Sequence, residues 1–94
     1  MRKVTRQAAN ALMAGKNFTS GNTVVKDGTM YLHRNAIARI DGDFAVLSTC
    51  GWNTSTTRER LNGIPNVVVI QRRGCLYLND VPWDGSTIRV YIHG

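Results

Sequence analysis

The chain has 94 residues, 43% of them hydrophobic, which predicts one folded domain over residues 1–94 and excludes a disordered segment. Twelve lysines and arginines against six aspartates and glutamates give a formal net charge of +6, and nine of the twelve cations are arginine. Because arginine presents a planar, permanently charged fork to phosphates and carboxylates, we expect an anionic partner, and no apolar run is long enough to predict a membrane span.

The first predicted element is a helix that begins near Thr5 and ends at Gly15. Thr5 is placed to cap its N-terminus, with Val4 packing onto Ala9, and Gly15 suits the left-handed residue that ends many helices. The apolar face of this helix is rich in alanine, so we expect it to lie close against a sheet. Its shortness and its lack of bulky apolar anchors argue against a membrane-surface helix.

The middle of the chain predicts an antiparallel meander of three or four short strands. Asp27-Gly28 lies between β-forming residues and is the usual signal of a two-residue hairpin. Further turns are expected at Arg34-Asn35 and at Asp41-Gly42-Asp43. The strands between these turns are expected at Thr23–Val25, Met30–His33, Ala36–Ile40 and Phe44–Ser48.

The C-terminal half predicts a short helix that ends at Gly63-Ile64-Pro65 and then further antiparallel hairpins. A turn is expected at Arg72-Arg73-Gly74, and Pro82 makes its strand a short edge strand. The strands are expected at Val67–Gln71, Cys75–Leu78, Val81–Trp83 and Ile88–Ile92. The predicted fold class is therefore α+β, with an N-terminal helix, a meander, a short helix and hairpins in a single compact domain.

The segment Gly51–Asn62 has the highest density of hydrogen-bonding side chains in the chain. Thr56 and Glu59 have the spacing of a capping box at the start of the short helix. The side chains before Thr56 offer alternative caps. Asn62-Gly63 is expected to form a left-handed exit. The alternative caps are Asn53, Thr54 and Ser55. Leu61 is expected to face the core, and Ile64 is expected to pack back onto the helix.

Arg58 and Arg60 have no such local explanation, because the helix dipole disfavours cations near a helix N-terminus. We expect them either to pair with Glu59 or Asp43 or to face a partner. We expect the double alanine variant to weaken partner binding and to leave thermal stability nearly unchanged. Trp52 is expected to anchor the loop. The candidate partner-binding residues are Arg58, Arg60, Arg72, Arg73, Arg34 and Trp52.

This segment resembles small tailed-bacteriophage proteins that carry a WNTxTTRERLN-type motif. The resemblance also covers an N-terminal helix ending near Phe18, Asn22-Thr23-Val24, and Tyr31-Leu32-His33 followed by Asn35 and Ile37-Ala38. Arg34 stands where the pattern has glycine, and Ser55 stands where it commonly has proline. The resemblance implies a phage accessory protein that acts in the host cytoplasm, and it implies no particular activity.

No pattern in the chain points to catalysis, a cofactor or a metal. The candidate zinc ligands are single residues far apart, without the close pairs of structural zinc sites: His33, Cys50, Cys75 and His93. Paired carboxylates and glycine-rich phosphate loops are also lacking from the sequence. Both cysteines are expected as buried, reduced thiols of a cytosolic protein, with a Cys50–Cys75 disulfide as the alternative.

We therefore expect a non-enzymatic binding protein that modulates a host or anti-phage nucleic-acid-handling system. One alternative is a direct nucleic-acid-binding protein, in which aromatic residues on an exposed sheet face would stack on bases. Its candidate residues are the cations Arg2, Lys3 and Arg6, the arginines in turns, and the aromatics Tyr31, Trp52, Tyr77, Trp83 and Tyr91. The further alternative is a minor virion component. Strand edges at Val81–Trp83 or Ile88–Ile92 are candidates for homodimer pairing.

Overall fold

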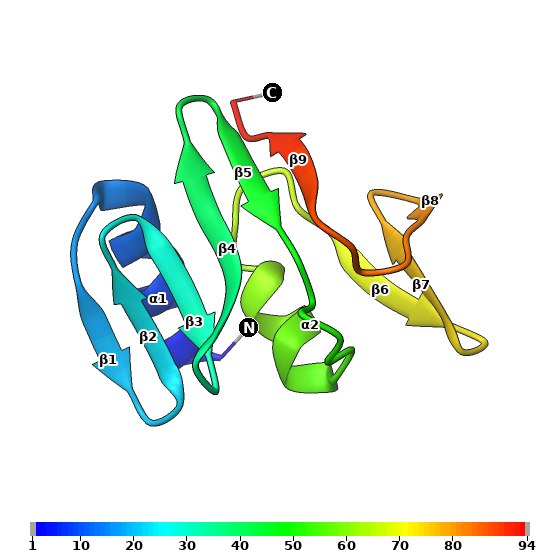
Figure 1. Ribbon diagram of the computed structural model, residues 1–94, viewed down its shortest axis with the longest axis horizontal. Coiled ribbons are helices and arrows are strands. Elements are labelled where there is room, and N and C mark those ends of the chain that lie inside the picture. Colours follow the sequence, from blue (N-terminus) through cyan, green and yellow to red (C-terminus); the bar gives the residue numbers. More distant parts are fainter. Residues whose placement is uncertain (1, 94) are drawn as a thin grey trace.

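The computed structural model describes residues 2–93, and over these residues it is an α+β fold of two helices and nine strands (Figure 1). This confirms the predicted class; Met1 and Gly94 of the predicted 1–94 domain lie outside the described residues. The elements are α1 (Lys3–Ala14), β1 (Phe18–Ser20), β2 (Thr23–Lys26), β3 (Thr29–Leu32), β4 (Asn35–Asp41), β5 (Phe44–Leu47), α2 (Ser55–Leu61), β6 (Val69–Arg72), β7 (Cys75–Leu78), β8 (Val81–Pro82) and β9 (Ile88–Tyr91).

The larger sheet is an antiparallel meander that the last strand completes. Its order is β1-β2-β3-β4-β5-β9, so the C-terminal strand returns to pair with β5. The predicted hairpin at Asp27-Gly28 is confirmed, and both residues have the positive φ angles that a tight hairpin requires. The next turn is His33-Arg34 rather than Arg34-Asn35, because Asn35 already pairs with Leu32. Strand β1 was not predicted, since three residues are too few to show an alternation.

Helix α1 packs against the larger sheet and against α2 (Figure 1). Gly15 ends the helix in the left-handed conformation, with φ 70°, as predicted. The prediction that Thr5 caps the helix is wrong: the helix begins at Lys3, and Thr5 is buried inside it. A Cβ atom on Gly63 would lie 2.8 Å from Thr5 Cγ2 and 3.1 Å from Ala9 Cβ. Because Gly63 has no side chain, the segment after α2 lies directly against Thr5 and Ala9 of α1.

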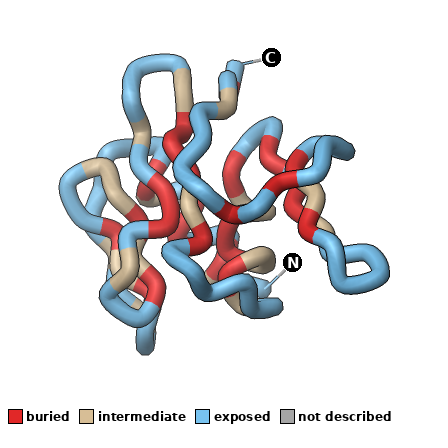
Figure 2. Tube along the Cα trace, turned by 45° about the vertical axis from the view of Figure 1, so that its right-hand side comes forward, coloured by how far each residue is buried: buried red, intermediate tan, exposed pale blue. Residues whose placement is uncertain are grey.

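The smaller sheet has the order β6-β7-β8, and its apolar side chains join the same core. Strand β6 begins at Val69, two residues later than predicted, although Val67 is buried. Strands β8 and β9 are edge strands of their sheets, as the sequence suggested. Figure 2 shows the buried positions gathered where the helices and the two sheets meet, and the loop tips exposed. The core comprises Ala8, Leu12, Val25, Met30, Leu32, Ile37, Ala38, Ala45, Leu47, Leu61, Ile64, Val67, Val69, Leu76, Leu78, Trp83 and Ile92.

The two cysteines are free thiols and both are exposed, so the predicted burial is wrong, and no disulfide links them. Cys50 lies in the loop after β5 with φ 53°, and its Sγ is 3.0 Å from the carbonyl oxygen of Ala36. Cys75 opens β7 at the tip of a hairpin. Neither described helix is long and apolar enough to cross a membrane.

Candidate partner-binding site

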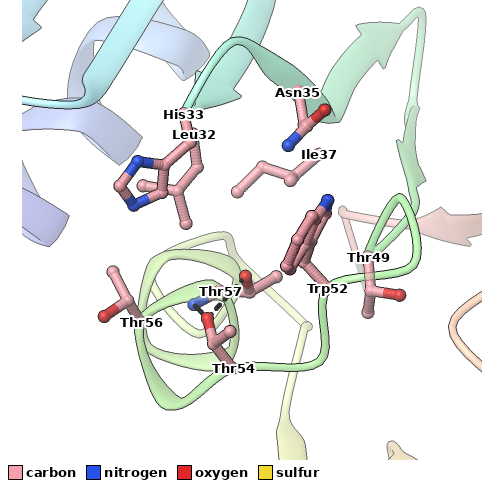
Figure 3. Close-up of a pocket in the computed structure, with 9 residues that line it drawn as sticks. All are labelled: Leu32, His33, Asn35, Ile37, Thr49, Trp52, Thr54, Thr56 and Thr57. Atoms are coloured by element: carbon pink, nitrogen blue, oxygen red, sulfur yellow. Dashed lines mark hydrogen bonds between the residues drawn. The ribbon is translucent and has the colours of Figure 1, made fainter.

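A groove of about 520 Å³ lies between the β3–β4 turn, the β5–α2 loop and the start of α2 (Figure 3). In Figure 3 the indole of Trp52 and the imidazole of His33 stand on opposite sides of the groove, with Ile37 reaching between them. Trp52 is 63% exposed. Trp52 was expected to anchor its loop, but it is largely exposed, and the loop is held instead by hydrogen bonds from Thr49 to Gly85. The groove is lined by Leu32, His33, Asn35, Ile37, Thr49, Trp52, Thr54, Thr56 and Thr57.

The loop that carries Trp52 is held in place from below by the β8–β9 connection. The backbone N–H of Thr49 donates to the Gly85 carbonyl oxygen at 2.9 Å, and the Thr49 hydroxyl donates to the same oxygen at 3.3 Å. Gly85 has φ 85°, and a Cβ atom there would collide with the Thr49 side chain. The backbone N–H of Trp52 donates to the Thr49 carbonyl oxygen at 2.8 Å. An exposed tryptophan therefore stands on an ordered support.

The N-terminal cap of helix α2 lies two residues earlier than the predicted capping box placed it. Thr54 is the cap, and its hydroxyl accepts from the backbone N–H of Thr57 at 3.1 Å. The predicted pairing of Thr56 with Glu59 is wrong, because Glu59 accepts instead from the backbone N–H of Arg2 at 2.9 Å. That hydrogen bond lowers the pKa of Glu59 below its ordinary value. Glu59 thus ties the start of α1 to α2.

The exit of α2 differs from the prediction. Asn62 has φ −67°, which is right-handed, and the positive φ angle comes later, at Asn66. The Asn62 side chain accepts from the N–H of Val69 at 2.6 Å and donates to the Val69 carbonyl oxygen at 2.9 Å. It thereby joins α2 to β6. Leu61 is fully buried and Ile64 packs into the core, as predicted.

Arg60 is buried, with only 7% of its surface exposed, so the expectation that it faces a partner is wrong. Its Nη1 donates to the Thr5 hydroxyl at 2.7 Å, and its Nε donates to the Thr23 hydroxyl at 3.0 Å. Burial and then the nearby charge of Arg2 lower the pKa of Arg60, while Glu59 raises it. The side chain joins α1, α2 and β2 and is part of the architecture.

Arg58 is half-buried and links the Trp52 loop to the smaller sheet. Its Nη1 lies 2.8 Å from Asn53 Oδ1 and 2.7 Å from Gln71 Oε1. The side-chain amide of Asn53 also reaches Gln71 Oε1, at 3.4 Å. Arg58 therefore has a structural role beside the candidate site.

The three arginines predicted in turns are exposed, but they do not form one surface. Arg34 follows His33 in the β3–β4 turn and stands beside the groove. Arg72 and Arg73 lie at the β6–β7 tip of the smaller sheet, far from that turn in Figure 1. The Arg72 guanidinium carbon is 5.8 Å from the Tyr77 ring centroid. Of the predicted partner residues, Trp52 is thus the accessible one that lines the groove, and Arg34 lines a neighbouring hollow that shares His33 with it.

Sequence reasoning missed the groove residues contributed by the β3–β4 turn and by Thr49. His33 was considered as a zinc ligand and not as a partner-binding residue, and within residues 2–93 the structure brings no three histidine, cysteine or acidic side chains together as a metal site. The available signal was Arg34 itself. A charged residue with φ 68° stands where the turn favours glycine, which marks this turn as a place to look for a site.

The family model described as Kyanoviridae Gp96 protein matches residues 1–94, the whole chain. The chain therefore belongs to this family of phage proteins, which confirms the phage origin that the sequence suggested. No curated protein and no solved structure matches the chain.

Proposed function

We propose that this member of the Kyanoviridae Gp96 family is a non-enzymatic accessory protein that binds a protein of a host or anti-phage nucleic-acid-handling system in the host cytoplasm. The observation that carries the proposal is Trp52, 63% exposed at the mouth of an apolar groove. Exposed tryptophan is uncommon on a surface that contacts only water, and tryptophan is among the residues that dominate binding energy at protein interfaces.

The support beneath Trp52 strengthens this interpretation. A side chain held by an ordered loop loses little conformational freedom on binding, so more of its contact energy contributes to affinity. The groove is lined by the aliphatic side chains of Leu32 and Ile37 and, at the start of α2, by the threonines Thr54 and Thr56. An apolar centre with a polar rim is the usual anatomy of a protein-binding surface.

Charge indicates the kind of partner. The net charge of +6 favours approach to polyanions and to acidic protein surfaces. Arg34 lines the hollow that shares His33 with the groove and adds a cation near the candidate interface, which favours a partner with an acidic rim next to an apolar anchor.

The test is affinity capture from a nuclease-treated lysate of infected host cells, with the wild type, Trp52→Ala and Val81→Ala as baits. Val81 is the matched control because it is also 63% exposed but lies on the smaller sheet. We expect a nucleic-acid-handling protein to be retained by the wild type and by Val81→Ala. Trp52→Ala should weaken its binding about thirtyfold, as for an interface anchor worth about 2 kcal/mol.

Equal retention by Trp52→Ala and the wild type would refute the role of the groove. If proteins are captured from an untreated lysate but none from the nuclease-treated lysate, the contacts run through nucleic acid. Recovery of the protein in purified virus particles, without a host partner, would point to a virion component instead.

A further inference from the structure

The larger sheet has one face covered by helices and one open face. α1 contacts β1 to β4, α2 contacts β4, and the two helices contact each other on the same side of the sheet. In Figure 1 α1 lies behind β1, β2 and β3, and no helix lies in front of these strands. Met30 and Leu32 are buried towards the helices, while Tyr31 between them is half-buried and points the other way.

Strand register places three aromatic rings and three cations on this open face. Residues directly opposite each other in a sheet share a face. Tyr31 pairs with Val24 and with Ala36 at one end of the face. Towards the other end, one series of opposite pairs runs across the strands: Lys26–Thr29, Thr29–Arg39, Arg39–Val46 and Val46–Arg89. Asp41, two residues after Arg39 on β4, lies on the same face and starts a second series, Asp41–Phe44 and Phe44–Tyr91. We call the set Lys26, Tyr31, Arg39, Phe44, Arg89 and Tyr91 the open sheet face.

One end of the open sheet face is a preassembled cluster. The Arg89 guanidinium carbon lies 4.3 Å from the Phe44 ring centroid, and Arg89 Nη2 lies 3.8 Å from Asp41 Oδ2. The Phe44 and Tyr91 rings meet edge to face with centroids 5.6 Å apart. Tyr91 remains 50% exposed, so its ring offers an accessible π surface.

The middle of the open sheet face carries the cation Arg39, and the end at Tyr31 adjoins a shallow hollow. Arg39 is exposed, and within residues 2–93 it makes no ion pair. Beside Tyr31 a shallow hollow of about 460 Å³ is lined by Gly21, Asn22, Val24, Tyr31, His33 and Arg34. A partner on this face therefore meets a ring at each end and an available guanidinium between them.

We propose that the open sheet face binds single-stranded nucleic acid, with bases stacked on Tyr31 and Tyr91 and a phosphate at Arg39. Aromatic platforms interleaved with cations are the recurring means of holding unpaired bases and their backbone. Tyr31 on β3 and Tyr91 on β9 are three strand spacings apart, about 14 Å across the sheet, and four residues apart along it, about 13 Å. The diagonal of about 19 Å is longer than the step between neighbouring nucleotides, so the two stacked bases belong to nucleotides of one strand that have others between them. A duplex keeps its bases stacked inside and would meet only the cations.

The test is fluorescence anisotropy with labelled single-stranded DNA and RNA of mixed sequence, and with the same sequence as a duplex. We expect saturable binding of a single strand and weaker binding of the duplex. Tyr31→Leu and Tyr91→Leu should each weaken binding about fivefold or more, as for the loss of one stacked base. Tyr91→Phe should retain wild-type affinity. Its retention separates the loss of a ring from a general loss of folding.

Arg39→Ala tests the phosphate contact, with Arg73→Ala as the matched control. Both side chains are exposed arginines, but Arg73 lies in the hairpin turn of the smaller sheet. Arg39→Ala should lower the slope of log affinity against log salt by about 0.7, the value for one contact with a single strand. Arg73→Ala should leave the slope unchanged.

Several results would overturn the proposal. These are the absence of wild-type binding at low salt, equal affinity for duplex and single strand, or equal effects of Arg39→Ala and Arg73→Ala. Trp52→Ala should bind the single strand as the wild type does, because Trp52 lies outside the open sheet face. Failure of this proposal therefore leaves the groove proposal standing, and failure of the groove leaves this one standing.

Discussion

Replacing Arg34 by glycine should stabilise the protein and, at the same time, weaken binding of its partner. Arg34 has φ 68°, in a two-residue turn between Leu32 and Asn35. A side chain in this left-handed region costs about 1–2 kcal/mol. Glycine relieves that strain but loses about 0.5–1 kcal/mol through the greater freedom of the unfolded chain. The net gain is about 0.5–1 kcal/mol, which for a domain of this size raises Tm by about 2–8 °C.

Asp80→Gly is the matched control for this measurement. Asp80 has φ 67° at the second position of the turn between Leu78 and Val81, so its backbone conformation is equivalent, while aspartate tolerates that conformation better than arginine. Thermal unfolding followed by circular dichroism, with urea denaturation as a second measurement, should show a gain for Arg34→Gly at least as large as that for Asp80→Gly. A loss of stability in Arg34→Gly alone would show that the Arg34 side chain makes stabilising contacts and would refute the strain argument.

The two variants should then separate in function. Arg34 stands beside the Trp52 groove, whereas Asp80 lies on the smaller sheet. Arg34→Gly should lower retention of the partner in affinity capture, because a cation at the interface is lost. Asp80→Gly should retain it fully. Wild-type retention by a stabilised Arg34→Gly would mean that the strained side chain serves no binding role.

Three further changes test the architecture around the site. Arg60→Ala should lower the unfolding free energy by about 2–3 kcal/mol in urea denaturation, because two buried hydroxyls lose a charged donor, whereas Arg73→Ala should change it by less than about 0.5 kcal/mol. Gly85→Ala should lower Tm and, in a Trp83→Phe background that leaves Trp52 as the one tryptophan, shift the tryptophan fluorescence, since the added Cβ displaces the supporting loop; an unchanged spectrum would contradict this. Glu59 has a lowered pKa, so its contribution to stability is present above its ordinary pKa of 4.5 and is lost as pH falls through the lowered value; Glu59→Gln should flatten that part of the acid unfolding profile.

The hairpins were largely predictable because their signals are local. Asp27-Gly28 sets the β2–β3 turn through backbone preferences of the two residues themselves. Gly15 ends α1 for the same kind of reason. The turn at His33-Arg34 was misplaced by one residue, because arginine gives no local signal for a positive φ angle whereas the next residue, Asn35, does. Only the pairing of strands β3 and β4 forces His33 and Arg34 into it.

The helix caps show the limit of local reasoning. Thr54 and Thr56 are both hydroxyl residues near the start of α2, and sequence alone offered both as caps. Thr5 had capping character as well, but its hydroxyl accepts from Arg60, which is 55 residues away in the chain. The Glu59 carboxylate accepts a hydrogen bond from the backbone N–H of Arg2 instead of one from the N-terminus of its own helix. Each choice depended on a partner that only the folded chain brings near.

Composition, turn residues and strand alternation were enough to establish the α+β class, the order of most elements and the basic character of the surface. They did not determine which arginines are accessible. Arg60 is buried because hydroxyls of α1 and β2 converge on it, and Arg58 is partly engaged by Gln71 of β6. The exposure of Trp52 was likewise decided by Gly85, which supports its loop from a distant connection. Burial and hydrogen bonding are set by segments far apart in sequence, so only the tertiary structure could determine these residues' roles.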